Sequence, residues 1–132
     1  MIPNKINWSE NFKLRIANSS ESFQKHEVVK LLYIMKYIEK HKNEKNWLRI
    51  YSEWEVMNGI ISDLYIENIK SKDCYTVEIQ KNITKEWTEN KVKQFKEWNV
   101  YGFNTSDLII IPLKDCPNEI SEINSWLDKF IF

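Results

Sequence analysis

Glycine and proline are scarce in this 132-residue chain, which contains two glycines and three prolines. It has no glycine-rich phosphate loop, and the patterns GxxxxGK, GxGxxG and HExxH are missing. Its two cysteines, Cys74 and Cys116, form no CxxC pair or other metal-binding pattern. The sequence therefore argues against a P-loop enzyme, a dinucleotide-binding domain and a zinc finger, and we expect reduced thiols in a cytoplasmic protein.

Long hydrophobic runs are also missing, since no apolar stretch approaches the length of a membrane span. The segment that begins Met1-Ile2-Pro3-Asn4 does not start a signal peptide. We therefore expect a protein without membrane contact that acts in the cytoplasm, of its own cell or of the host of a virus or mobile element.

An excess of one charge is missing as well, because 19 basic residues balance 19 acidic ones. Composition thus does not predict a general polyanion binder. The charge is nevertheless uneven: residues 25–49 hold seven basic and three acidic side chains, and residues 97–132 hold two and six. A locally basic segment could follow a phosphate backbone, but it is equally typical of a solvated helix.

Hydrophobic residues make up 42% of the chain, and six are tryptophans, which indicates a globular domain rather than disorder. We expect a single domain over residues 1–132. Its core spans about residues 23–113, after an N-terminal arm (residues 1–20, with alternating apolar residues at 12–16) and before a C-terminal helix (residues 117–132).

Hydrophobic spacing predicts a helix over about residues 21–41, a strand over 47–54, two strands within 60–81 and a helix from 82 or 84 to about 98. A strand over 107–113 and a last helix with Pro117 at its first position follow. The expected buried residues of the first helix are Val28, Leu31, Leu32, Met35 and Ile38. In the second helix, apolar contacts are expected from Trp87, Val92, Phe95 and Trp98. In the last helix, the residues expected to face inward are Ile120, Ile123, Trp126, Leu127 and Phe130. The run 108–111 is typical of a strand buried on both faces.

The stretch IISDLYIENIKSKDCYTVEIQK, residues 60–81, predicts a hairpin with a polar loop over residues 68–73. In this register Glu67 lies opposite Cys74, and Asp63 lies opposite Glu78. Gln80 shares the face of these two carboxylates, whereas Lys81 points to the other face. Like charges placed opposite one another on a sheet repel, so the pair predicts a positive charge between them.

A divalent ion is the natural candidate for that charge, because Mg²⁺ takes oxygen ligands and keeps several waters. Such an ion polarises a phosphodiester and lowers the pKa of an attacking water. The alternative is a solvated strand face that carries a few acids. His26 and His41 have no partner spacing typical of a metal site, so we expect surface or core roles for both.

The Asp63 hairpin followed by Glu78-Ile79-Gln80 resembles the PD-(D/E)xK nuclease signature in its Glu-x-Gln form. Two positions depart from that signature: Ser62 stands where proline is usual, and Gln80 where lysine is commonest. The expected order helix, strand, strand, strand, helix, strand also matches the αβββαβ restriction-endonuclease-like core of this superfamily, here with an extra C-terminal helix. The fold class implied is α/β with a mixed sheet.

Two further segments carry the resemblance. The segment 26–32, HEVVKLL, looks like the first helix of archaeal Holliday-junction resolvases, in which a glutamate completes the metal site. Ser52-Glu53 is similar to a Ser-Glu pair in competence-type and replication-relaxation proteins. The third acid would then be Glu27, with Glu53 as the alternative.

The resemblance implies a Mg²⁺- or Mn²⁺-dependent DNA endonuclease, for branched DNA or within a mobile element, and a homodimer is compatible with it. Asp63, Glu78 and Glu27 would bind the metal, and Gln80 would position water or phosphate. Lys91 or Lys93 would supply the missing positive charge. The DNA-contacting residues would be Lys85, Lys91, Lys93 and Gln94. The alternatives are a nuclease fold that binds DNA or protein without cutting, and a structural protein in which both acids face solvent.

Overall fold

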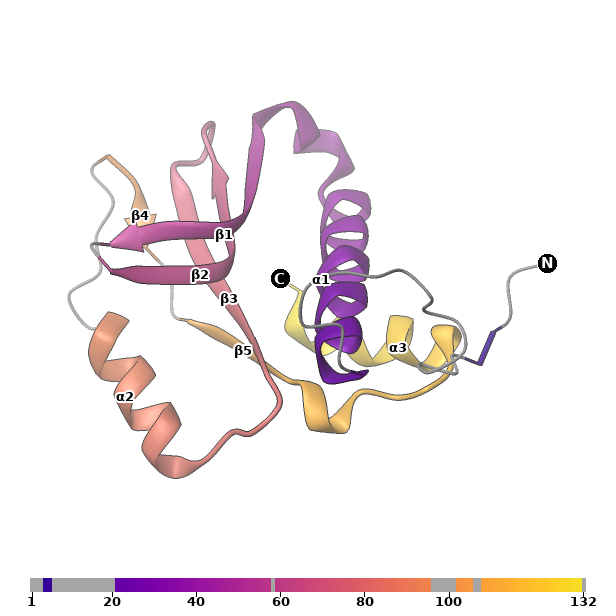
Figure 1. Ribbon diagram of the computed structural model, residues 1–132. Helices are drawn as coiled ribbons and strands as arrows, with labels where there is room; N and C mark the ends of the chain where they lie inside the picture. The colour runs from indigo at the N-terminus through magenta and orange to yellow at the C-terminus, as the bar shows by residue number, and fades with distance from the viewer. Residues whose placement is uncertain (1–3, 6–20, 58, 96–101, 106–107, 132) are drawn as a thin grey trace.

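The computed structural model describes residues 4–5, 21–57, 59–95, 102–105 and 108–131 (Figure 1). Its helices are α1 (Glu21–Lys40), α2 (Lys85–Phe95) and α3 (Ile120–Leu127). Its strands are β1 (Leu48–Met57), β2 (Ile60–Asn68), β3 (Asp73–Gln80), β4 (Asn104–Thr105) and β5 (Ile109–Pro112). Short 3₁₀ helices occupy Lys42–Trp47, Leu113–Asp115 and Asp128–Phe130. The predicted extended arm at residues 12–16 lies outside the described residues.

The five strands form one mixed sheet, which confirms the predicted α/β class. β1 pairs with β2 and β2 with β3, both antiparallel, whereas β4 and β5 lie parallel to β3 along its other edge. The chain passes from β3 through α2 before it reaches β5, as a parallel pair requires. The predicted order αβββαβ with a following helix is therefore present, with the two-residue β4 as an addition.

The main core lies between one face of the sheet and the pair α1 and α3 (Figure 1). It contains Leu64 and Ile66 of β2, Val77 and Ile79 of β3, and Ile111 of β5, together with the buried residues of α1 and α3. A smaller cluster around Tyr65 and Cys74 lies on the other face, where Phe95 of α2 packs. The sheet is thus thickly covered on one side and sparsely covered on the other.

The predicted buried face of α1 is only partly correct: Val28 and Leu32 pack against the core, but the other three predicted residues are exposed. Leu31 is 59% exposed, Met35 58% and Ile38 39%. The helix instead buries Val29, Tyr33 and Tyr37, at spacings of four residues. Tyrosine can occupy this face because its ring fills the core while its hydroxyl finds a partner, and the Tyr33 hydroxyl donates to the Phe130 carbonyl at 3.0 Å. The helix is therefore rotated relative to the expectation.

Three smaller expectations also need correction. Of the apolar contacts predicted for α2, Phe95 packs against the smaller cluster, Val92 is 57% exposed, and Trp98 lies outside the described residues. In β5 only Ile111 is fully buried, since the strand pairs with β3 alone. The last helix begins at Ile120 rather than Pro117, and it buries Ile123 and Leu127 as expected.

Among the described residues, no helix is both long and apolar enough to cross a membrane. Cys74 and Cys116 are free and buried.

Candidate functional site

The hairpin of β2 and β3 has the predicted register. Tyr65 pairs with Thr76 and Glu67 with Cys74, and the ladder ends at Leu64 and Val77. The next opposite residues are Asp63 and Glu78, where the two strands separate into a fork. The Asp63 carboxylate fills this fork, because its Oδ2 accepts a 2.7 Å hydrogen bond from the Ile79 N–H.

Glu78 is buried beside Asp63, with only 5% of its surface exposed. The two carboxyl groups share a side-chain hydrogen bond. Burial and the negative charge of Asp63 raise the pKa of Glu78 to about 8, although the nearby Lys91 opposes this shift. The Lys91 Nζ lies 3.5 Å from Glu78 Oε1, too far for a well-formed bond, and Oε1 has no hydrogen-bond partner among the described residues.

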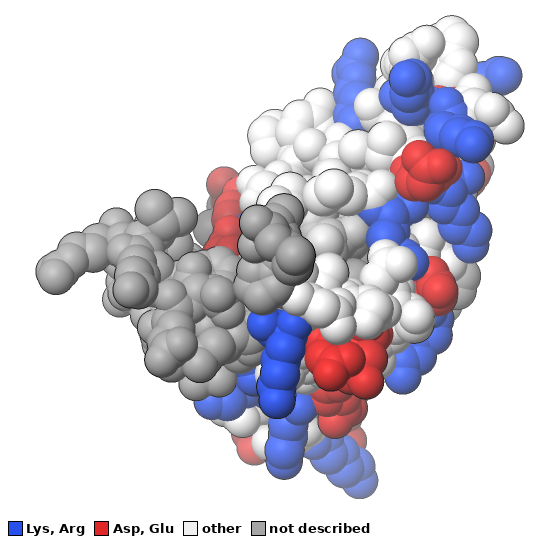
Figure 2. Space-filling model, turned by 90° about the vertical axis from the view of Figure 1, so that its right-hand side faces the viewer, with Lys and Arg blue, Asp and Glu red and all other residues white. Residues whose placement is uncertain are grey.

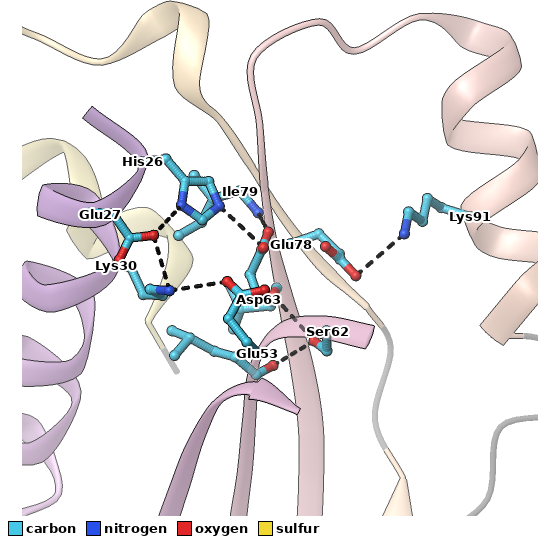
Figure 3. Close-up of polar contacts among 11 residues, drawn as sticks. His26, Glu27, Lys30, Glu53, Ser62, Asp63, Glu78, Ile79 and Lys91 are labelled. Carbon is cyan, nitrogen blue, oxygen red and sulfur yellow. Dashed lines mark hydrogen bonds and ion pairs between the residues drawn. The ribbon is translucent and has the colours of Figure 1, made fainter. Parts of the chain in front are cut away.

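His26 of α1 joins the site from the other side (Figure 3). Its Nε2 lies 3.1 Å from Asp63 Oδ1, and its Nδ1 lies 3.1 Å from Glu27 Oε1. Burial lowers the pKa of His26, but the two carboxylates outweigh it and the net pKa is raised. For Asp63, burial raises the pKa, but hydrogen bonds from His26 and the Ile79 N–H outweigh it and the net pKa is lowered. The pair therefore favours an imidazolium facing a carboxylate.

Lys30, one turn further along α1, supplies a second cation. Its Nζ lies 3.2 Å from Glu27 Oε1 and donates to Glu53 Oε1 at 3.1 Å. The side chain is only 8% exposed. Burial lowers the Lys30 pKa, but the bonds to Glu53 and Glu27 outweigh it, so the net pKa is raised. His26 and Lys30 thus supply positive charge to Asp63, Glu27 and Glu53, whereas the cation that faces Glu78 is Lys91.

Glu53 lies on β1 in the register position opposite Asp63, between the pairs Ser52–Leu64 and Trp54–Ser62. Its φ of +51° places it in the left-handed region, which is unusual for a residue other than glycine. One ligand atom each from His26, Glu53 and Asp63 lie within 4.8 Å of one another. Acids on three adjacent strands, Glu53, Asp63 and Glu78, therefore meet at one level of the sheet.

A cavity of about 660 Å³ opens onto this group. It lies between the first turns of α1 and the strand ends, and its lining residues are Phe23, His26, Glu27, Lys30, Ser52, Glu53, Asp63, Ile79, Gln80, Lys81 and Leu113. Gln80 is present as predicted. Lys81, predicted on the opposite face, also lines the cavity, because β3 ends at Gln80 and the strand alternation does not continue. Glu78 and Lys91 are not among the lining residues, and Figure 3 shows their contact on the α2 side of β3.

The predicted residues thus divide into two groups. Asp63, Glu78, Gln80 and Glu27 come together around the fork, although Glu27 meets Asp63 only through His26. The predicted DNA contacts Lys85, Lys91, Lys93 and Gln94 all lie on α2. Lys85, Lys93 and Gln94 are exposed there, and Lys91 also lies over the Trp87 ring, 5.9 Å from its centroid.

His26 and Lys30 were not predicted as site residues. A signal for His26 exists in the sequence, because residues 26, 29, 33 and 37 form one row at helical spacing. Extending the Tyr37, Tyr33 and Val29 row by one turn leads to His26. The row was missed because the leucines and isoleucines on the neighbouring face dominate the hydrophobic pattern.

The sequence matched no family model, and comparison with curated proteins and with solved structures gave no match either.

The left-handed backbone at Glu53 leads to a stability prediction. We expect Glu53→Gly to be more stable than Glu53→Ala by about 1 kcal/mol, because only glycine adopts a positive φ without steric cost. Both variants lose the same carboxylate, so the comparison isolates the backbone. The measurement is urea unfolding of both proteins. The matched control is Ser52 on the same strand, where alanine should be the more stable replacement; glycine less stable than alanine at both positions would contradict the prediction.

Proposed function

We propose that this chain is a divalent-metal-dependent DNA endonuclease of the PD-(D/E)xK type. The observation that supports it best is the fork between β2 and β3. Asp63 lies there beside Glu78 on the neighbouring strand, and Gln80, two residues further on, lines the adjoining cavity. This is the residue set on which the resemblance rests, brought together by the strand register.

The residues at the fork fit a divalent ion. Glu78 Oε1 is buried without a hydrogen-bond partner among the described residues, and burial beside Asp63 raises the pKa of Glu78 to about 8, so that this carboxyl group holds a proton at neutral pH. A cation that replaced this proton would satisfy both groups. Asp63 and Glu78 would hold the ion, with Glu53 as a further oxygen donor. When bound, Mg²⁺ or Mn²⁺ would polarise the scissile phosphate and make water a better nucleophile.

The chain's own residues would position the substrate. Gln80 can hold a phosphate oxygen or the attacking water through its amide, but it brings no charge. Lys30 lines the same cavity and is the better candidate for the missing positive charge, because Lys91 faces Glu78 on the other side of β3. Glu27 fixes His26 and Lys30 through its carboxylate, and we assign it a positioning role.

The exposed side chains of α2 are the proposed DNA contact. Lys85, Lys93 and Gln94 are exposed on a helix that stands off the sheet near the fork. By contrast, Figure 2 shows lysines, arginines and acids interspersed around an uncharged area on the face it draws. That face offers no large field of positive charge, so we place the nucleic acid on the α2 side.

A second candidate is a nuclease fold that binds DNA or protein without cutting. One observation favours it: His26 and Lys30 already neutralise Asp63, Glu27 and Glu53 without any metal. A site balanced in this way has less need of a divalent ion.

One assay separates the two candidates. The purified chain is incubated with single-stranded, duplex and branched DNA, each with Mg²⁺, Mn²⁺ or EDTA. We expect cleavage of at least one substrate with metal and none with EDTA. Asp63→Asn should lose this cleavage, whereas Glu122→Gln, an exposed acid on α3, should retain it. DNA binding without cleavage under every condition would favour the second candidate, and cleavage that persists in Asp63→Asn would point to a contaminant.

A further inference from the structure

We propose that His26 joins Asp63 and Glu53 as a ligand of the metal site, and that this nitrogen ligand makes the site prefer first-row transition ions such as Mn²⁺ and Zn²⁺ to Mg²⁺. This inference deepens the proposed function, on which it rests for the ion's role in cleavage. The metal site itself can be tested without nucleic acid.

The three ligand atoms come from three elements, α1, β1 and β2, and lie within 4.8 Å of one another. Ligands bonded to one ion at about 2.1 Å lie no more than about 4.2 Å apart. Three ligands around a tetrahedral ion lie about 3.4 Å apart, so the group needs to contract by up to about 1.4 Å to surround an ion. The open cavity beside it leaves room for water or a phosphate oxygen as further ligands.

The orientation of His26 is an independent indication of a metal ligand. A histidine that binds metal usually donates its other ring N–H to a carboxylate, which fixes the ring and its tautomer. Here Glu27 Oε1 lies 3.1 Å from Nδ1, and Nε2 faces Asp63. Glu27 is not a member of the three-ligand group, and it lies where a supporting carboxylate should be.

Glu78 adds negative charge beside Asp63, although its Oε1 faces Lys91 Nζ at 3.5 Å on the other side of β3 (Figure 3). This carboxylate is more than nine-tenths buried, and it shares a hydrogen bond with Asp63 on the neighbouring strand. An ion on Asp63 would also lower the cost of a negative charge on Glu78. Lys91 compensates the charge of Glu78 only in part, because the pKa of Glu78 stays raised beside Asp63.

A bound ion would replace two positive charges that now face the acids, the proton on His26 and the ammonium group of Lys30. The proton on His26 Nε2 leaves to solvent, and the nitrogen lone pair binds the ion. Glu53 releases Lys30, whose Nζ keeps its 3.2 Å contact with Glu27. Imidazole suits transition ions, whereas Mg²⁺ prefers carboxylate, carbonyl and water oxygens. This difference is the source of the proposed preference.

Direct binding measurements test the ligand set. The full chain, freed of metal by chelation, is titrated with Mn²⁺ and followed by electron paramagnetic resonance, with Mg²⁺ as a competitor. We expect His26→Gln and Glu53→Gln to weaken Mn²⁺ binding at least about tenfold, since even supporting residues have effects of this size. His41→Gln and Glu122→Gln are the matched controls and should bind as the parent does. Unchanged affinity in both His26→Gln and Glu53→Gln would overturn the proposal, as would equal competition by Mg²⁺.

A measurement on the unmodified chain removes any concern about misfolded variants. The chain has two histidines, and His41, which directly follows α1, is an internal control about 22 Å along the helix from His26. We expect Zn²⁺ to shift the ring ¹⁵N signal of Nε2 in His26 and to leave His41 unchanged. A titration that moves neither histidine would overturn the inference, even if the chain cleaves DNA with Mg²⁺. Conversely, a Zn²⁺ shift at His26 without any cleavage would support the metal site and leave the endonuclease proposal to fail alone.

Discussion

The metal-free protein is expected to lose stability as the pH rises from about 5 to 8, opposite to the trend of a protein stabilised by ordinary ion-paired carboxylates. Glu78 is the main cause. Burial and the charge of Asp63 raise its pKa from 4.5 to about 8, so the folded chain holds a proton that the unfolded chain releases. Its stabilising contribution is complete below about pH 4.5 and is lost as the pH rises through the folded value. Because each pKa unit corresponds to about 1.4 kcal/mol, the loss should be on the order of a few kcal/mol.

His26 also lowers the free energy of unfolding as the pH rises, whereas Asp63 affects this free energy only outside the range from pH 5 to 8. The His26 pKa is raised above 6.5, so its contribution is present below that value and is lost as the pH rises through the folded pKa. The Asp63 pKa is lowered from 3.8, so its contribution is present above 3.8 and is lost only as the pH falls through the folded pKa. Over pH 5 to 8 Asp63 therefore adds no opposing slope.

Urea unfolding of the metal-free chain between pH 5 and 8.5 measures this slope. Glu78→Gln keeps the shape of the side chain and cannot ionise, so its free energy of unfolding should depend on pH much less steeply. Glu122→Gln, an exposed acid on α3, should keep the parental slope. If Glu78→Gln and the parent show the same slope, the proton is not held at Glu78.

Leu64→Ala is expected to lower the free energy of unfolding by about 2–5 kcal/mol, whereas Leu31→Ala should change it by less than about 0.5 kcal/mol. The two substitutions delete the same atoms. Leu64 is fully buried between the sheet and α1, and its removal leaves a cavity in the core. Leu31 is 59% exposed on the opposite side of α1, where a shorter side chain leaves no cavity.

The comparison tests the rotation of α1 directly, since the hydrophobic pattern predicts that Leu31 is buried. The measurement is chemical denaturation of both variants at one pH. Equal losses in the two proteins would show that the Leu31 face of α1 is covered in solution, either by other parts of the chain or by a second copy. A concentration-dependent loss would identify the second copy.

The local pattern of the sequence determined the elements and the register of the central hairpin. Alternation over residues 60–67 and 74–81 excludes a slip of one residue, and the length of the polar loop between them selects the pairing. That pairing places Asp63 opposite Glu78, and the ladder follows it to its last pair. The α/β class follows from the predicted helix between two strands, because parallel strands need a long crossover connection of this kind.

Only the tertiary structure determined which face of α1 is buried and which residues make up the site. Leucine, methionine and tyrosine all satisfy the helical period, so the sequence could not show that α1 turns its tyrosines inward. That rotation brings His26 and Lys30 to the strand ends, where both contact acids from other elements. The hydrophobic periodicity of the sequence also does not predict the fork at Asp63 or the left-handed backbone at Glu53. The sequence by itself therefore determined that Asp63 and Glu78 share a level of the sheet. Long-range packing decided which cations face the acids, because the contacts of His26 and Lys30 with the sheet join residues 23 and more positions apart.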